Sequence, residues 1–131
     1  MNESAISRWH NIVKTRDAGE LCELLADDVG FHSPVVHTPQ IGKEVTKMYL
    51  SAAIQVLGNS HFKYVREIVS ETDAVLEFET EIDRVVVNGV DMIKWNDAEQ
   101  IKEFKVMIRP LKAINLIHQK MIETLQRTSN S

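Results

Sequence analysis

Hydrophobic side chains in the first 25 residues recur at the spacing of helices. A first helix is predicted from about Glu3 to Thr15, and its buried stripe consists of Ile6, Trp9, Ile12 and Val13. The segment DAGE then supplies Asp17 as an N-cap with Glu20 three residues later, which is a capping-box pattern. A short second helix follows, with a buried stripe of Leu21, Leu24 and Leu25.

The next stretch combines a short strand, a loop and a longer helix. The strand is expected at about Val29 to His32, and two prolines in SPVVHTPQIG indicate an extended loop after it. A third helix is predicted from Lys43, with Gly58 as its C′ residue. The side chains expected on one side of this helix are Val45, Met48, Tyr49, Ala52 and Val56.

From residue 61 onward the hydrophobic pattern changes to the alternation typical of strands. Four strand candidates are HFKYVREIVS, AVLEFETEIDRVVV, VDMIKWN and IKEFKVMIR. The segments ETD, VNG and NDAEQ are predicted to form the turns between them. Strands this close in sequence, with no helix between them, are expected to pair antiparallel.

A closing helix is predicted after the last strand, because Pro110 suits the first position of a helix. Its stripe consists of Leu111, Ile114, Ile117, His118, Met121 and Leu125. Three helices, an antiparallel meander and a closing helix predict an α+β fold. A length of 131 residues fits a single domain over residues 1–131.

The alternation assigns two different faces to the sheet. One face is apolar and carries Leu76, Phe78, Thr80, Ile82, Phe104, Val106 and Ile108. The other is charged, with Glu77, Glu79 and Glu81 on one strand and Lys63, Lys94 and Lys105 available on others. Opposite charges on neighbouring strands stabilise a sheet by roughly 0.2–1 kcal/mol per pair. We interpret the charged face as solvated, or as a partly polar homodimer surface.

Asp91 interrupts the apolar face. In the strand around VDMIKW, alternate side chains share a side, so Asp91 points the same way as Ile93 and Trp95. A buried carboxylate must be hydrogen-bonded, solvated by a cavity or held protonated. We therefore expect Asp91 to face a pocket, with the alternative that it closes the VNGVD turn by bonding backbone amides.

Composition and charge limit the partners and the compartment. The net charge of −4, with no Lys/Arg cluster, argues against nucleic-acid binding. No apolar run approaches the roughly 20 residues of a membrane span, and the amino terminus has no secretory h-region, so we expect a cytoplasmic protein. The single cysteine, Cys22, excludes an internal disulfide and is expected to be a packed helix residue rather than a reactive thiol.

Three strings, AGELCELLADDVGFHSPV, GKEVTKMYL and WNDAEQIKEFKVMIRP, resemble the NTF2-like superfamily, in particular its SnoaL-like branch. The resemblance extends over nearly the whole chain. It implies a cone-shaped α+β barrel, in which a strongly bent sheet wraps around the helices and leaves a cavity at its open end. Members include ketosteroid isomerases, polyketide cyclases, dehydratases and epoxide hydrolases, and also binding domains that catalyse nothing, so the fold alone does not give the activity.

Comparison with the ketosteroid isomerases makes Asp91 the strongest site candidate. GVDMIKWND lines up with the isomerase strand that carries a protonated acid, and Asp91 falls on that acid. Ser33 stands where these isomerases have their Asp base, and Ile12 stands where they have a tyrosine. A serine cannot abstract a carbon-bound proton unaided and isoleucine cannot donate a hydrogen bond, so steroid isomerase chemistry of that type is rejected.

The remaining candidates surround the expected pocket. His32 and His37 flank SPVV in the loop that, by resemblance, borders the cavity mouth, and either imidazole is a candidate helper for Asp91. Candidate ligand-contacting residues are Trp9, Phe31, Ser33, Tyr49, Ile93, Trp95 and Phe104, although each aromatic is also explained as ordinary core. His118 is expected to be a core residue of the last helix. No metal-ligand spacing or nucleotide fingerprint is present, so we expect no metal and no cofactor.

Two functions therefore stay open. The first is a small-molecule pocket protein that acts as a cofactor-independent cyclase, isomerase or lyase, with Asp91 moving a proton on a hydrophobic or carbonyl-containing ligand. The alternative is a non-catalytic ligand-binding or assembly domain in which Asp91 only orients the ligand. In both cases a homodimer through the outer face of the sheet is expected.

Overall fold

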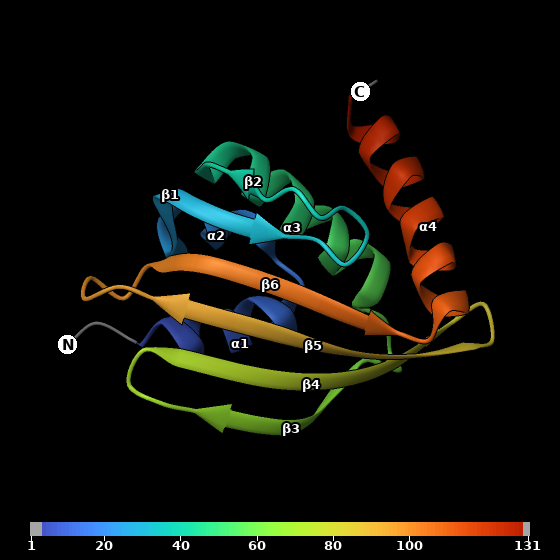
Figure 1. The fold of residues 1–131 in the computed structure, drawn as a ribbon, viewed down its shortest axis with the longest axis horizontal. Helices are drawn as coiled ribbons and strands as arrows, with labels where there is room; N and C mark the ends of the chain where they lie inside the picture. Colours follow the sequence, from blue (N-terminus) through green and yellow to red (C-terminus); the bar gives the residue numbers. More distant parts are fainter. Residues whose placement is uncertain (1–3, 130–131) are drawn as a thin grey trace.

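The computed structural model describes residues 4–129 and has one curved six-stranded sheet with helices on one of its faces (Figure 1). The helices are α1 (Ala5–Thr15), η1 (Ala18–Glu20, a 3₁₀ turn), α2 (Leu21–Leu24), α3 (Lys43–Leu57) and α4 (Leu111–Ser129). The strands are β1 (Leu25–His32), β2 (Gln40–Ile41), β3 (Lys63–Val69), β4 (Asp73–Ile82), β5 (Val85–Trp95) and β6 (Ile101–Arg109). This arrangement confirms the predicted α+β class.

The sheet has the order β2-β1-β6-β5-β4-β3. All neighbouring strands pair antiparallel except β1 and β6, which are parallel. Helices α1 and α3 lie behind the sheet in Figure 1, and α4 rises beside α3 at the end of β6. Within residues 4–129, no helix is long and apolar enough to cross a membrane.

The N-terminal helices form largely where the pattern places them, with two corrections. Ser4 caps α1 by accepting a hydrogen bond from the Ser7 amide, and Asp17 accepts one from the Gly19 amide to begin η1. Glu20 makes no capping bond, so the predicted capping box is not complete. Cys22 is exposed and not packed as predicted. Helix α2 is a single turn whose buried side carries Leu21 and Leu24, so Cys22 lies on the side that faces solvent.

The first strand and the β4–β5 turn also differ from the prediction. Strand β1 begins at Leu25, four residues earlier than expected. The turn between β4 and β5 is formed by Asp83 and Arg84, whose φ angles of 49° and 68° lie in the left-handed region. The segment VNG is therefore not a turn and lies inside β5.

Gly89 has a packing role that explains the misleading VNG signal. It pairs with Phe78 of β4, whose ring lies directly over it. A Cβ atom added at Gly89 would lie 2.3 Å from Phe78 Cζ and 2.9 Å from the Met107 carbonyl oxygen. Both approaches are shorter than van der Waals contact, so only glycine fits at this position.

Gly89→Ala is expected to destabilise the protein by roughly 1–3 kcal/mol, the usual cost of overpacking a core. Gly30→Ala is the matched control, because Gly30 also lies in a strand but an added Cβ would meet only Ile41 Cδ1, at 3.4 Å. The control is expected to be close to neutral. Urea unfolding of both variants measures the difference, and equal stabilities would contradict the packing account of Gly89.

The predicted faces of the sheet are confirmed by burial. Leu76, Phe78, Thr80 and Ile82 are buried on β4, as are Phe104 and Val106 on β6. Asp91 lies on the same buried face as Ile93 and Trp95, with only 6% of its surface exposed. The carboxyl group therefore points to the side of the sheet that the helices cover.

The buried stripes of α3 and α4 are shifted from the predicted ones. The buried residues of α3 are Thr46, Leu50, Ala52 and Ile54, and Met48 is 42% exposed. This helix contacts both β1 and α4, so its buried side is not the single stripe of a helix on one sheet. In α4, Ala113 and Ile117 pack on Phe78 and Val87, while His118 is exposed and is not the core residue that was expected.

The start of α4 is displaced by one position. The Pro110 carbonyl accepts hydrogen bonds from the amides of Ala113 and Ile114. Pro110 therefore stands immediately before the helix rather than at its first position.

Candidate functional site

An apolar cavity of about 200 Å³ opens between the inner face of the sheet, α3, α4 and the loop at residues 33–36. Six of the site residues predicted from the sequence line it: Trp9, Phe31, Ser33, Tyr49, Asp91 and Phe104. The aromatic rings hold one another in place, since Trp9 meets Phe104 edge-on at 4.8 Å between centroids and Phe31 stacks on Tyr49 at 5.7 Å. The cavity wall is thus preformed by packed rings, as is usual for small-molecule sites.

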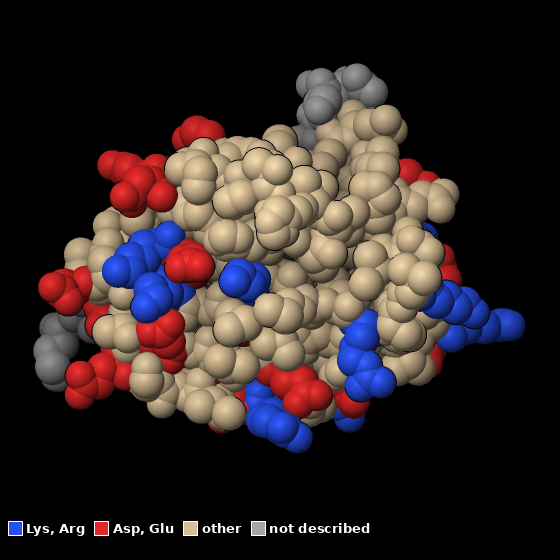
Figure 2. Space-filling model, in the orientation of Figure 1, with Lys and Arg blue, Asp and Glu red and all other residues tan. Residues whose placement is uncertain are grey.

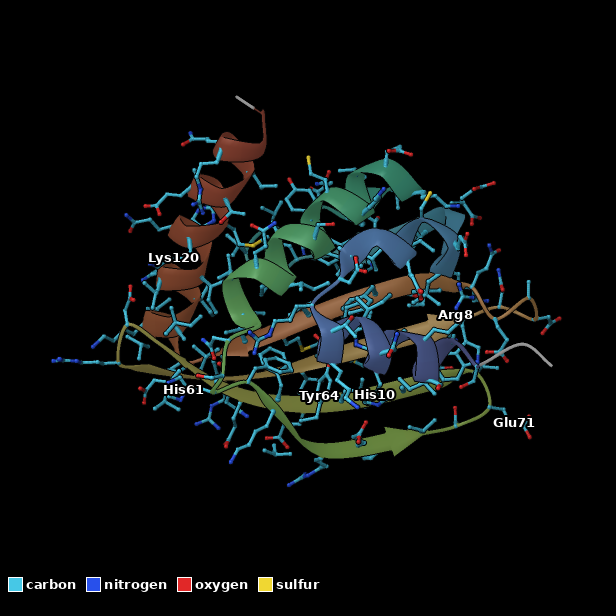
Figure 3. All side chains as sticks on the ribbon, turned by 180° about the vertical axis from the view of Figure 1, so that it is seen from behind. Arg8, His10, His61, Tyr64, Glu71 and Lys120 are labelled. Carbon is cyan, nitrogen blue, oxygen red and sulfur yellow. The ribbon has the colours of Figure 1, made fainter. Side chains whose placement is uncertain are left out.

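A chain of hydrogen bonds leads from α1 through β3 to Asp91. Trp9 Nε1 donates to the Tyr64 hydroxyl oxygen at 3.0 Å, and that hydroxyl donates to Asp91 Oδ2 at 2.7 Å. All three residues line the cavity. The Tyr64 ring also meets the ring of His10, a residue of α1, edge-on (Figure 3). The chain fixes one carboxyl oxygen of Asp91 and leaves Oδ1 without a hydrogen bond to any of residues 4–129.

The environment of Asp91 favours its neutral form. Burial raises the pKa of the Asp91 carboxyl to about 7, because an ionised carboxylate loses its hydration there. The hydrogen bond from Tyr64 acts in the opposite direction and lowers this pKa, but burial is the larger effect. Near neutral pH, Asp91 therefore exists in both protonation states, which is the condition under which a carboxyl group transfers protons best.

Tyr64 is the site residue that the sequence analysis did not select. Burial and the adjacent Asp91 carboxyl raise the pKa of its phenol well above the ordinary value, so Tyr64 stays protonated and acts as a donor. Ile12, which stands where the isomerases have a tyrosine, is buried in the core, and its side chain carries no polar atom. The sequence signal of Tyr64 was its aromatic ring, which made it one of several side chains that could line an apolar pocket, and the structure pairs it with the inward-facing Phe78.

Two of the expected ligand-contacting residues do not line the cavity. Ile93 and Trp95 are buried in the core cluster that also contains Ala5, Trp9 and Ile12 of α1. Trp95 Nε1 donates to the Glu71 carbonyl at 2.9 Å, which attaches the end of β5 to the β3–β4 turn. These two side chains lie on the same face of the sheet as Asp91, as the alternation predicts. They belong to the core that packs against α1 and do not reach the cavity.

The three histidines near the site occupy different places. His32 and His37 do not line this cavity; together with Lys105 they line a neighbouring open depression, which shares residues of the 33–36 loop with it. His32 Nε2 lies 3.5 Å from Glu103 Oε1. His118, in contrast, lies on α4 among the residues that line the apolar cavity. The structure therefore brings His118, rather than His32 or His37, to the cavity of Asp91.

Metal ligation has no support in the described part of the chain. Among residues 4–129, no group of three or more His, Cys, Asp or Glu side chains is arranged to hold a metal ion. The polar side chains that line the cavity carry carboxyl, hydroxyl, phenol, indole and imidazole groups.

The family model for the SnoaL-like domain matches residues 6–104. The crystal structure of a steroid delta-isomerase from Pseudomonas aeruginosa is 30% identical, covers 97% of this chain and 93% of its own, and superposes with a TM-score of 0.91. An uncharacterised cystatin-like protein from Silicibacter pomeroyi is 29% identical over 91% of this chain and 83% of its own, with a TM-score of 0.83.

A more distant structure, an NTF2-like protein of unknown function from Mesorhizobium loti, is 18% identical over 81% of this chain and 88% of its own. Its TM-score of 0.70 supports the fold alone. No match was found among curated protein sequences. The fold expected from the sequence resemblance is confirmed by these structures.

Proposed function

Since this chain belongs to the SnoaL-like domain family, we propose that it binds a small, largely apolar carbonyl compound and uses Asp91 to catalyse a cofactor-independent proton transfer on it. One observation supports this most: a buried carboxyl group ends the Trp9–Tyr64–Asp91 hydrogen-bond chain at the wall of an apolar cavity. The class of reaction is isomerisation, cyclisation or elimination next to a carbonyl group.

The geometry gives Asp91 the part of an acid. Tyr64 occupies Oδ2, so the proton of neutral Asp91 resides on Oδ1 and is free to be donated. A ligand carbonyl oxygen that accepts this hydrogen bond becomes more negative as its α-carbon loses a proton. The bond strengthens as the charge develops, which is how an oxyanion site lowers a barrier.

The size and lining of the cavity limit the ligand. A volume of about 200 Å³ lies below the roughly 300–1,000 Å³ of pockets that hold drug-sized ligands. The lining is aliphatic and aromatic apart from a few polar groups, and none of its side chains is a lysine or an arginine. A neutral molecule of one or two carbon rings with one carbonyl group fits these properties.

The similarity to a steroid delta-isomerase supports proton transfer as the chemistry but not the details of a shared mechanism. Ser33 lines the cavity, and its Oγ accepts hydrogen bonds from the amides of Val35 and Val36. It therefore shapes the 33–36 loop and offers no carboxylate base. The suggestion that His32 or His37 assists Asp91 remains a prediction, since both line the neighbouring depression.

Non-catalytic ligand binding is the second candidate function. It is favoured by Ser33 and Ile12, which cannot act as a base or as a hydrogen-bond donor to an oxyanion in the way the isomerase residues do. In that case neutral Asp91 would only orient the ligand carbonyl. The two functions differ in whether bound ketones exchange their α-protons.

Exchange of α-protons for deuterium in 2-decalone, a neutral bicyclic ketone, tests the proposal without knowledge of the natural substrate. We expect the protein to accelerate this exchange in D₂O, followed by proton NMR. Asp91→Asn should lower the rate by about 100-fold or more, in line with the usual contribution of a general acid or base, and leave the dissociation constant within a few-fold. Asp28→Asn, at an exposed position, is the matched control. Binding without exchange in the unmodified protein would instead establish the non-catalytic function.

The cytoplasmic location expected from the sequence remains a prediction.

We also propose that two copies of the chain associate through the outer face of the sheet. This face carries Glu77, Glu79 and Lys105 around exposed apolar residues, of which Met107 is 51% exposed. Figure 2 shows acidic and basic groups dispersed over it with uncharged surface between them. Such a mixture suits a homodimer better than a nucleic-acid partner.

Sedimentation equilibrium at micromolar concentration is expected to give twice the chain mass of 14.9 kDa. Met107→Lys should weaken the dimer at least tenfold, because it replaces an exposed apolar side chain of this face with an ammonium group. Met48→Lys is the matched control, since Met48 is similarly exposed but lies on α3. A monomer at all micromolar concentrations, or equal effects of the two variants, would contradict this interface.

A further inference from the structure

The proton-transfer chemistry proposed above needs a base as well as an acid, and the obvious positions do not supply one. The residues lining the cavity include four that can gain or lose a proton: Tyr49, Tyr64, Asp91 and His118. Asp91 is the acid in the proposed reaction. The base must therefore come from the other three, or from outside the cavity.

The two tyrosines are unsuitable. The Tyr64 hydroxyl donates its proton to Asp91 and accepts a hydrogen bond from Trp9, so its oxygen is engaged on both sides. The Tyr49 ring is stacked on Phe31 in the wall, and a phenol group is in general a hydrogen-bond donor rather than a base. Imidazole, by contrast, is the side chain that most readily takes up a proton between pH 5 and 8.

His118 also lies on a different wall from Asp91. Asp91 belongs to strand β5, so it lies on the wall of the cavity that the sheet forms. His118 belongs to the second turn of α4, which forms another wall. On α4 it stands among Ile117, Met121, Ile122 and Leu125, all of which line the same cavity. Within residues 4–129, its side chain makes no hydrogen bond, ion pair or ring contact. This imidazole is therefore available to a ligand in the cavity.

We propose that His118 is the general base of this site, acting on the carbon next to the ligand carbonyl that Asp91 holds. This inference rests on the proposed function of the cavity, and it assigns to α4 the part that the resemblance would place at Ser33. It also identifies the substrate class as ketones whose α-carbon reaches the α4 wall while the oxygen contacts the sheet.

With a β,γ-unsaturated ketone, the reaction moves one proton from the α-carbon to the γ-carbon. An imidazole nitrogen of His118 takes the α-proton, so the C–H bond breaks and an N–H bond forms. The electron pair of the broken bond forms a double bond between the α-carbon and the carbonyl carbon, and the carbonyl oxygen takes the proton of the Asp91 O–H group, which gives a dienol and the Asp91 carboxylate. The imidazolium then gives its proton to the γ-carbon, the β,γ double bond shifts to the α,β position, the carbonyl double bond re-forms, and the enol proton returns to Asp91. Both side chains regain their initial states.

The same chemistry explains why no metal, redox cofactor or second substrate is required. The step is a redistribution of one proton and one electron pair within the ligand. In a saturated ketone the cycle stops at the enol and reverses, and in D₂O the returned proton is a deuteron. Exchange of 2-decalone therefore reports the action of His118 directly.

His118→Ala is the decisive variant. We expect it to lower the rate of 2-decalone exchange by about 100-fold or more, with ketone affinity within a few-fold of the original. Because His118 is exposed, the variant is expected to fold normally. Added imidazole at millimolar concentration should restore at least a tenth of the lost rate, since a free base can occupy the space left by the side chain. His61→Ala removes an exposed imidazole outside the cavity lining and is the control.

The outcomes separate this inference from the proposed function. Loss of exchange in both Asp91→Asn and His118→Ala, with rescue of the latter by imidazole, supports both. Loss in Asp91→Asn with full activity in His118→Ala overturns the inference and leaves the proposed function intact, as does loss in His32→Ala or His37→Ala instead. An unmodified protein that binds the ketone without exchanging it overturns both.

Discussion

Asp91→Asn is expected to be more stable than the unmodified protein at pH 8, and close to it in stability at pH 4. Folding holds the pKa of this carboxyl at about 7, whereas its ordinary value is 3.8. Between those two pH values the unfolded chain gains free energy by ionising Asp91 and the folded protein does not. The free energy of unfolding therefore falls as pH rises, by roughly 4 kcal/mol in total, and the loss is complete above pH 7.

Asparagine removes this pH dependence because it cannot ionise. Its amide oxygen still accepts the Tyr64 hydrogen bond and its amide nitrogen still offers a donor to the cavity. Urea unfolding from pH 4 to pH 8 measures the effect as a growing stability difference between the two proteins. Asp28→Asn, at an exposed position, provides the control. A variant that is less stable at every pH would show that Asp91 is an ionised structural residue.

Tyr64→Phe is expected to lower stability by about 2–4 kcal/mol. It leaves the Trp9 indole N–H without its acceptor and Asp91 Oδ2 without its donor, and an unsatisfied buried polar group costs roughly 1–3 kcal/mol. The pKa of Asp91 should also rise further, because the Tyr64 hydrogen bond lowers it in the original protein. Thermal unfolding measures the first effect, and carboxyl-carbon NMR measures the second.

Tyr49→Phe is the matched control for this variant. Tyr49 lines the same cavity, but within residues 4–129 its hydroxyl makes no hydrogen bond. Its removal should change stability by less than about 1 kcal/mol and leave Asp91 unaffected. If Tyr64→Phe lowered the pKa of Asp91, or had no larger effect than Tyr49→Phe, the hydrogen-bond chain would not have the role assigned to it.

Local sequence patterns predicted those features that depend on neighbours in the chain. The alternation in β4 and β6 assigned the buried face correctly, and the same parity placed Asp91 on that face with Ile93 and Trp95. Capping by Asp17 was also predictable, since its partner is only two residues away. The family resemblance then supplied the bent sheet and the cavity.

The features that were missed depend on contacts between distant segments. Asn88-Gly89 is a strong turn signal, yet Gly89 is needed because the ring of Phe78 covers it in the paired strand. The Trp9–Tyr64 bond joins residues 55 positions apart, so no local pattern indicates it. His118 was assigned to the core because its helical stripe is apolar, whereas part of that stripe, including His118, lines a cavity.

A carboxyl-carbon NMR titration of Asp91, with and without bound 2-decalone, tests the central claim most directly. The claim is that a buried, neutral Asp91 presents its proton to a ligand carbonyl in the cavity. We predict a pKa of about 7 in the free protein, and a higher value when the ketone is bound, because the ligand accepts a hydrogen bond only from the protonated form. A pKa at or below 3.8, unchanged by the ketone, would contradict the account.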